Sequence, residues 1–205
     1  MTGPLIVLWR HGRTALNAAG RLQGQSDIDL DDVGRAQAQA AAAALAALVP
    51  TKIVSSDLRR ARDTASALAE ITGARVEDDP RLRERNFGLW EGLDREEIER
   101  GWPTAFAAWR RGREPEGIGA DSRRDVAARM HEAILEHAAG LSGDDVVVVV
   151  SHGAAITLAL SALLSLDPQS WFGFAGLDNC HWAVLAPNPG RSPGWRLTAH
   201  NVGAE

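Results

Sequence analysis

The feature that most constrains the fold of this chain is a set of three short apolar runs, at Leu5–Trp9, Ile53–Val54 and Val146–Val150. Residues that are apolar at consecutive positions are typical of strands buried on both faces of a parallel sheet. Helical periodicity follows each run, and strands that alternate with helices build a doubly wound sheet. We therefore predict an α/β fold, in which helices cover both faces of a mostly parallel central sheet.

Three helices are expected from the spacing of apolar residues and from signals at the helix ends. Pro50 cannot continue a helix, and Gly73 and Gly140 are typical residues just past a helix C-terminus. The predicted helices run from Asp31 to about Val49, from Leu58 to Ala69 and from about Asp121 to Ala139.

Two other segments modify this plan. Residues 91–120 carry tryptophans, arginines and a tail with glycine and proline. We interpret this segment as a small helical insertion that lies over the functional site. Cys180–Ala186 and Trp195–Asn201 flank a turn-rich segment, and this pattern predicts a hairpin at a sheet edge. The expected architecture is a single domain over residues 1–205, a three-layer α/β/α sandwich with a mixed, mostly parallel sheet and a helical cap at about 91–120.

Composition excludes several classes of protein. A formal net charge of −5 over 205 residues argues against general binding of nucleic acid. Cys180 is the only cysteine, so neither an intrachain disulfide nor a cysteine-based zinc cluster is available. The apolar stretches are shorter than the roughly 20 residues that span a membrane. No signal-peptide pattern precedes the first predicted strand, so we expect a cytoplasmic protein.

Polar motifs stand beside or after the predicted strands. Arg10-His11-Gly12 follows the first run directly, Ser55–Ala61 follows the second, and Ser151-His152-Gly153 follows the third. Leu82-Arg83-Glu84 lies in a loop between them. Because the carboxyl ends of parallel strands meet at one edge of a sheet, we expect these motifs to gather there. Together they indicate an enzyme that handles phosphate.

The cations of these motifs suit a phosphoryl group. Arg10 and Arg60 can each present a planar pair of N–H donors to phosphate oxygens. His152 and the amide of Asn17 can donate further contacts. With this many donors, a histidine nucleophile needs no metal ion.

Two residues remain for the chemistry itself. His11 is free to attack the phosphorus, and Glu84 is the best candidate for the acid that protonates the departing alcohol. Glu84 could instead be a surface carboxylate that pairs with Arg83 or Arg85.

The chain resembles the histidine phosphatase superfamily, in the branch of phosphoglycerate mutase and small bacterial phosphatases. The resemblance covers nearly the whole chain, in blocks at 10–17, 21–27, 55–61, 82–92 and 151–153. It implies that His11 becomes phosphorylated, that Glu84 is the proton donor, and that the phosphoryl group is bound by Arg10, Arg60 and His152. It also implies contacts to the substrate or its phosphate from Asn17, Gln23, Gly24 and Gly153.

The expected activity is metal-independent hydrolysis of a small phosphomonoester, such as a sugar phosphate or a phosphoglycerate derivative, through phosphohistidine. No metal ion or other cofactor is expected. The expected partner is the small-molecule substrate, with no nucleic acid and no membrane, and a homodimer is conceivable. The alternatives are a phosphoglycerate mutase-type phosphotransferase, which shares these chemical residues, and a non-catalytic phosphate-binding module on the same fold.

Two features of the insertion have more than one interpretation. Trp102, Phe106 and Trp109 at helical spacing favour a small apolar core over a platform that stacks on a sugar. The run Arg110–Arg113 favours a solvated surface over a site for an anionic part of the substrate.

Overall fold

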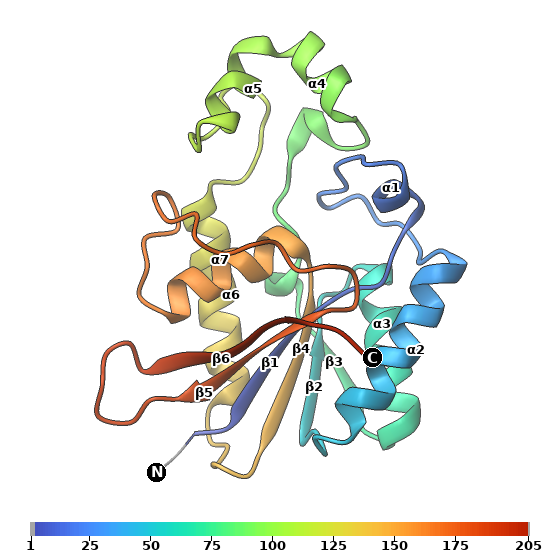
Figure 1. Cartoon of the computed structure of the whole chain (residues 1–205), viewed down its shortest axis with the longest axis vertical. Coiled ribbons are helices and arrows are strands. Elements are labelled where there is room, and N and C mark those ends of the chain that lie inside the picture. The colour runs from blue at the N-terminus through green and yellow to red at the C-terminus, as the bar shows by residue number, and fades with distance from the viewer. Residues whose placement is uncertain (1–2, 205) are drawn as a thin grey trace.

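A mixed six-stranded sheet forms the centre of the computed structural model, which describes residues 3–204 (Figure 1). The strand order is β3-β2-β4-β1-β5-β6. The strands are β1 Leu5–Arg10, β2 Lys52–Ser55, β3 Val76–Asp78, β4 Val146–Ser151, β5 Trp182–Pro187 and β6 Trp195–Val202.

Four of the strands run parallel to one another, β5 runs antiparallel to them, and β6 runs antiparallel to β5. β1 and β2 each pair in parallel with β4, and β2 pairs in parallel with β3. β5 pairs antiparallel with β1, and β6 with β5, so the predicted hairpin forms one edge of the sheet. The predicted mostly parallel, mixed sheet is confirmed. β3, a short strand at the opposite edge, was not expected from the sequence.

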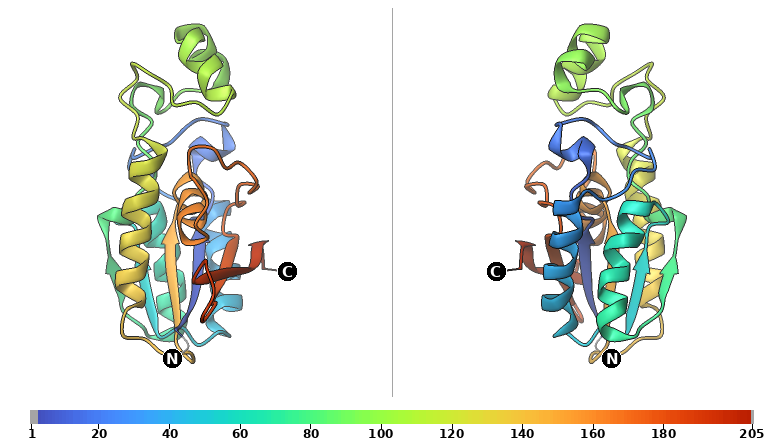
Figure 2. Two further views of the ribbon diagram at one scale, coloured as in Figure 1. Left: turned by 90° about the vertical axis from the view of Figure 1, so that its left-hand side faces the viewer. Right: turned by 90° about the vertical axis from the view of Figure 1, so that its right-hand side faces the viewer.

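Helices cover both faces of the sheet, as the two side views show (Figure 2). On one face, Val7 and Trp9 pack with the helices α2 (Asp32–Ala46) and α3 (Arg59–Thr72). On the other face, Ile6 and Leu8 pack with α6 (Arg123–Ala138) and α7 (Gly153–Leu163). Successive residues of a strand point to opposite faces, so the continuous apolar runs fill both layers of the core. The predicted three-layer α/β/α sandwich is confirmed.

The helix ends differ from the predicted ones by a few residues. Asp31 caps α2 by accepting a hydrogen bond from the N–H of Gly34. The helix then ends at Ala46 rather than near Val49. The N–H of Val49 donates to the carbonyl of Ala46, so the chain tightens into a turn. Pro50 accounts for this early end, because the residue before a proline avoids the helical conformation.

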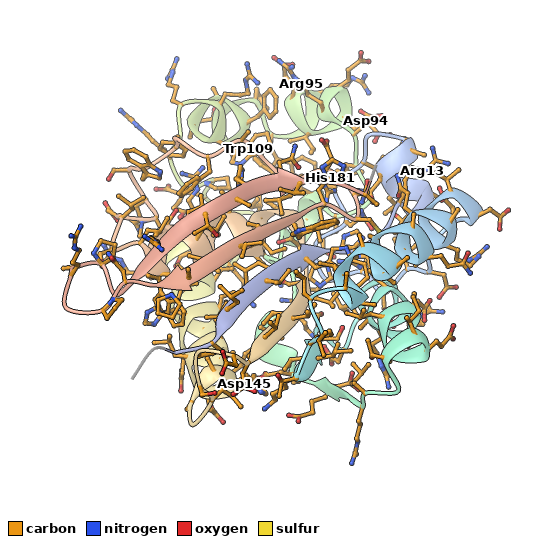
Figure 3. The ribbon with its side chains drawn as sticks, turned by 60° about the horizontal axis from the view of Figure 1, so that its bottom comes forward. Arg13, Asp94, Arg95, Trp109, Asp145 and His181 are labelled. Atoms are coloured by element: carbon orange, nitrogen blue, oxygen red, sulfur yellow. The ribbon has the colours of Figure 1, made fainter. Side chains whose placement is uncertain are left out.

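The segment predicted as an insertion lies beyond the carboxyl ends of the parallel strands (Figure 1). We call residues 91–120 the cap. It holds the helices α4 (Arg95–Gly101) and α5 (Pro103–Arg110). Figure 3 shows Asp94 and Arg95 on the cap and Asp145 at the opposite end of the sheet.

The cap packs around an apolar cluster that it shares with Phe87 and Trp90, which precede it in the chain. Phe106 is buried, and it packs with Trp90, Trp102 and Trp109. The prediction that Trp102, Phe106 and Trp109 belong to an apolar core is therefore confirmed for Phe106, and it holds in part for Trp102 and Trp109, which are partly buried against the same cluster. The single domain over residues 1–205 with its cap stays a prediction.

The remaining elements are short. They are α1 Ala15–Ala18 and the 3₁₀ turns η1 Pro80–Leu82 and η2 Gly88–Trp90. Between residues 3 and 204, none of the helices combines the length and the apolar character that crossing a membrane requires.

The packing of α2 against the sheet gives a prediction of stability. Leu45 is completely buried, so Leu45→Ala is expected to lower the free energy of unfolding by about 2–5 kcal/mol. The matched control is Leu48, which follows α2 and is 39% exposed. Leu48→Ala is expected to change the free energy of unfolding by about 0.5 kcal/mol or less. Urea unfolding of the two variants measures both values. Equal losses would contradict the assignment of Leu45 to the core.

Candidate active site

His11 stands directly after β1 and is almost completely buried. Its Nδ1 lies 2.7 Å from the carbonyl oxygen of Gly12. A carbonyl oxygen only accepts hydrogen bonds, so Nδ1 carries the proton and Nε2 keeps a free lone pair. Burial, followed by the charges of Arg60 and Arg10, lowers the pKa of His11 well below its usual value of 6.5. The ring is therefore neutral near pH 7 and can act as a nucleophile through Nε2.

Arg10 and Arg60 bring two guanidinium groups to the same place from different elements. Arg10 is the last residue of β1 and donates to the carbonyl oxygen of Leu177. Its Nε is buried and has no partner among the described residues. Arg60, in the first turn of α3, donates to the carbonyl oxygens of Ser26 and Gly24, both at 2.7 Å.

Arg60 is buried and Arg10 is partly buried, and neither has an acidic hydrogen-bond partner among the described residues. Every hydrogen-bond partner of Arg10 and Arg60 within residues 3–204 is neutral. Burial lowers the pKa of Arg60 to about 10 and also lowers the pKa of Arg10. A buried charge without a counter-ion costs free energy, which an anion bound between the two groups would offset. The arrangement is thus suited to a phosphate group.

Glu84 lies in the loop after η1, and the beginning of α7 holds its carboxylate in the site. Its Oε1 accepts hydrogen bonds from the backbone N–H groups of Arg85 and Ala155, both at 2.8 Å. Its Oε2 accepts only from the N–H of Ala154, at 3.1 Å, and so keeps capacity for a proton.

The alternative of a surface carboxylate is wrong, because Glu84 is only 8% exposed. Arg83 pairs instead with Asp57, and Arg85 pairs with Glu114.

His152 lies behind Arg60 rather than at the surface of the site. Its Nδ1 accepts a hydrogen bond from Nε of Arg60 at 3.2 Å, and its Nε2 therefore donates to Oγ of Ser56 at 2.8 Å. Its ring centroid is 5.1 Å from that of His11. Burial, followed by the charge of Arg60, lowers the pKa of His152 well below 6.5. In this arrangement His152 orients Arg60.

A cavity of about 210 Å³ connects these groups. We call it the phosphate cavity. Of the nine residues predicted for the site, only His152 is not in its wall. The others that line it are Arg10, His11, Asn17, Gln23, Gly24, Arg60, Glu84 and Gly153.

Thr14 orients the two amides of the phosphate cavity. Oγ1 of Thr14 donates to Oε1 of Gln23 at 2.9 Å, and Oδ1 of Asn17 accepts from the N–H of Thr14 at 3.2 Å. Asn179 also donates to Oδ1 of Asn17. With both amide oxygens occupied, the NH₂ groups of Asn17 and Gln23 remain as donors for a bound anion.

Glu91 holds the loop that supports Arg60, and the sequence interpretation missed this role. Its carboxylate accepts from the N–H groups of Gln25 and Ser26 at 2.9 and 3.0 Å, and from that of Phe87 at 3.1 Å. Gly24 approaches Glu91 so closely, at a φ of +54°, that a Cβ atom would overlap the carboxylate. Gly24 is therefore needed for its backbone rather than for a side chain.

A segment without any recognisable motif completes the site. Gly176 and Leu177 line the phosphate cavity, and Nδ2 of Asn179 donates to the carbonyl oxygen of His11 at 3.1 Å. No sequence signal marks these residues, because they contribute backbone groups and a single amide.

Comparison with known proteins gives the family of this chain. The model of the histidine phosphatase superfamily (branch 1) matches residues 6–202. The chain belongs to this superfamily. The resemblance inferred from the motifs is thereby confirmed.

Two relatives and a solved structure illustrate the relationship. A glucosyl-3-phosphoglycerate phosphatase of Mycolicibacterium vanbaalenii is 42% identical and covers 98% of this chain and 95% of its own length. A probable phosphoglycerate mutase of Yersinia enterocolitica is 38% identical over 80% of this chain and 77% of its own. The structure of a mycobacterial glucosyl-3-phosphoglycerate phosphatase with VO3 has a TM-score of 0.88 at 40% identity, over 97% of this chain and 99% of that one.

The unpaired arginines predict that inorganic phosphate stabilises the fold. At about 100 times its Kd, phosphate should add about 2.7 kcal/mol, which corresponds to a rise in Tm of about 5–10 °C. Arg60→Met should abolish this rise, whereas Arg59→Met should keep it, since Arg59 is exposed and pairs with Asp27. Thermal unfolding with and without phosphate measures the effect. A full rise in the Arg60→Met protein would contradict the site.

The environment of His11 predicts its titration. Since burial and the arginine charges lower its pKa, the ring should stay neutral, with the proton on Nδ1, from about pH 8 down to about pH 6. The neutral ring stabilises the folded state fully above about pH 6.5. Below that pH the histidine of the unfolded chain takes up a proton that the folded chain does not, so the free energy of unfolding falls. Nitrogen-15 NMR of the histidines reports the tautomer. A doubly protonated His11 at pH 6 would contradict the prediction.

Proposed function

We propose that this protein is a phosphomonoesterase that hydrolyses a small phosphorylated metabolite through phosphohistidine on His11, without a metal ion. The observation that carries the proposal is the phosphate cavity, in which buried Arg60 and partly buried Arg10, neither hydrogen-bonded to an acidic group, lie beside a neutral histidine. Positive donors and an unprotonated nucleophile are the two requirements of phosphoryl transfer to a side chain.

In the first step, Nε2 of His11 attacks the phosphorus while the bond from phosphorus to the ester oxygen breaks. Arg10 and Arg60 hold the non-bridging oxygens, on which charge concentrates in the transition state. Glu84 gives a proton to the departing ester oxygen, so the first product leaves as a neutral alcohol. Oε2 is the oxygen of Glu84 that we assign to this transfer, because it accepts only one hydrogen bond.

In the second step, water attacks the phosphorus of phosphohistidine while the bond from phosphorus to Nε2 breaks. The Glu84 carboxylate takes a proton from that water. Inorganic phosphate leaves, and His11 and Glu84 return to their starting states. Asn17, Gln23 and the backbone beside Gly24 and Gly153 are the proposed additional contacts to the substrate.

For His152 we propose a role through Arg60. The hydrogen bond between Nε of Arg60 and Nδ1 of His152 supports this role, since it holds the guanidinium plane in place. A direct contact with the phosphoryl group, which membership of the superfamily implies, requires the N–H on Nε2 of His152 to leave Oγ of Ser56.

The names of the relatives support a narrower substrate. Two relatives that cover nearly the whole chain at 41–42% identity are called glucosyl-3-phosphoglycerate phosphatases. We therefore propose a sugar derivative of phosphoglycerate as the substrate, and glucosyl-3-phosphoglycerate as the first compound to try. The cytoplasmic location and the homodimer stay predictions.

Phosphate release from a panel of sugar phosphates, phosphoglycerates and an aryl phosphate tests the activity, with EDTA present. We expect the wild type to release phosphate, His11→Ala to lose at least about 1,000-fold in kcat/KM, and Glu84→Gln to lose about 100- to 10,000-fold. His131→Ala, a histidine on α6 outside the site, is the matched control and should keep full activity.

Two results would overturn the proposal. Release that survives in His11→Ala would remove phosphohistidine from the mechanism. Turnover of phosphoglycerate only when 2,3-bisphosphoglycerate is added would establish a mutase instead.

A further inference from the structure

We propose that a second cavity, beside the phosphate cavity, is a leaving-group subsite that binds one ring with an apolar face. The inference rests on the proposed function, because it concerns the alcohol portion of the same phosphate ester. The second cavity has a volume of about 280 Å³, and we call it the ring cavity. Pockets for small molecules measure roughly 300–1,000 Å³, so this volume suits one ring rather than a long chain.

The two cavities adjoin each other at the proton donor. They share four lining residues, which are Phe87, Gly153, Ala154 and Gly176. The N–H of Ala154 is also the group that holds Oε2 of Glu84. Because Glu84 must reach the ester oxygen that departs, the leaving group lies on the Glu84 side of the phosphorus. That side opens into the ring cavity.

Five aromatic side chains contribute to the wall of the ring cavity. Phe87 and Trp109 contribute to it from the cap side, and Trp171, Phe172 and Phe174 contribute from the segment that follows α7. Figure 3 shows Trp109 on the cap helix α5. Aromatic rings bind the flat, apolar faces of other rings, including the C–H face of a sugar. Trp109 thus packs against the apolar cluster of the cap and also lines the ring cavity.

Arg85 and Arg123 also line the ring cavity, and its two hydroxyl side chains suit the hydroxyl groups of a ligand. Oγ1 of Thr157 donates to the carbonyl oxygen of Gly153, and Oγ of Ser161 donates to that of Thr157. Each hydroxyl has therefore used its proton and offers lone pairs to a ligand. A sugar ring has both features that this wall complements, namely an apolar face and hydroxyl donors at its rim.

Trp171 and Phe172 form the exposed outer part of the wall, and Phe172 contacts the cap and α6. Trp171 and Phe172 are 45% and 57% exposed. The guanidinium of Arg123 lies 4.5 Å from the centre of the Phe172 ring and donates to the carbonyl oxygen of Gly112. Gly112 leaves no room for a Cβ atom beside Phe172, so the cap and the aromatic segment touch here. Large exposed aromatic side chains in a fixed cavity wall mark a binding surface.

Binding to the His11→Ala protein tests the subsite without turnover. The probes are phenyl phosphate and glucose 6-phosphate, which carry a ring, and glycerol 3-phosphate and inorganic phosphate, which do not. Trp171→Ala and Phe172→Ala, each added to His11→Ala, should weaken the binding of the two ring esters about five- to tenfold, as measured by calorimetry. The affinity for the two probes without a ring should change by less than about twofold.

Leu89→Ala is the matched control, because Leu89 is a 60% exposed apolar residue outside both cavities. It should change none of the four affinities. Unaltered binding of inorganic phosphate also shows that each variant is folded. Equal weakening of all four probes, or no weakening of the ring esters, would overturn the subsite. Weakening of phenyl phosphate alone would support the subsite and assign it to aryl esters rather than sugar esters.

Turnover by proteins that keep His11 separates this inference from the proposed function. If the wild type releases no phosphate from any ester, the proposed function fails, while the binding result still decides the subsite. If the wild type hydrolyses ring esters and Trp171→Ala and Phe172→Ala leave kcat/KM unchanged, the subsite fails and the function stands.

Discussion

The register between β1 and β4 brings both histidines to one point. Arg10 pairs with Ser151 at the ends of these strands, and the N–H of His11 donates to the carbonyl oxygen of Ser151. His11 and His152 therefore leave the sheet side by side. A shift of the register by one residue would turn the strand side chains to the opposite faces and separate the two rings. Because β4 is a run of five valines buried on both faces, its apolar residues alone do not select one register, and the change to polar residues at Arg10 and Ser151 marks where the two strands end together.

Backbone carbonyls, rather than carboxylates, hold the cations of the site. Arg60 donates to the carbonyl oxygens of Gly24 and Ser26, and Glu91 holds the same loop through backbone N–H groups. Glu91 thus binds the loop rather than the guanidinium, which has no hydrogen bond to a carboxylate within the described residues. This separation keeps Arg60 oriented and still available to an anion.

The sequence predicted most of this site because its residues follow strands. The ends of parallel strands meet whatever the details of the loops, so Arg10 and His11 could be placed from the strand pattern, whereas Glu84, in a loop, was assigned from the need for an acid and from the family resemblance. The position of His152 behind Arg60 could not be, since it depends on a side-chain rotamer. Glu91 and the aromatic segment after α7 were also missed. Their roles arise from contacts between segments far apart in the chain, and no local pattern marks them.

The cap and the segment after α7 supply most of the aromatic wall of the ring cavity, whereas the residues that hold the phosphate come mainly from the sheet edge and the loops beside it. Changes at Trp109 or Trp171 therefore alter neither the strand register nor the orientation of His11. A lineage of such proteins could exchange one alcohol for another by substitutions in these two surface segments alone, with the catalytic step inherited intact. A library of variants that aims to change the substrate can likewise be confined to these two segments.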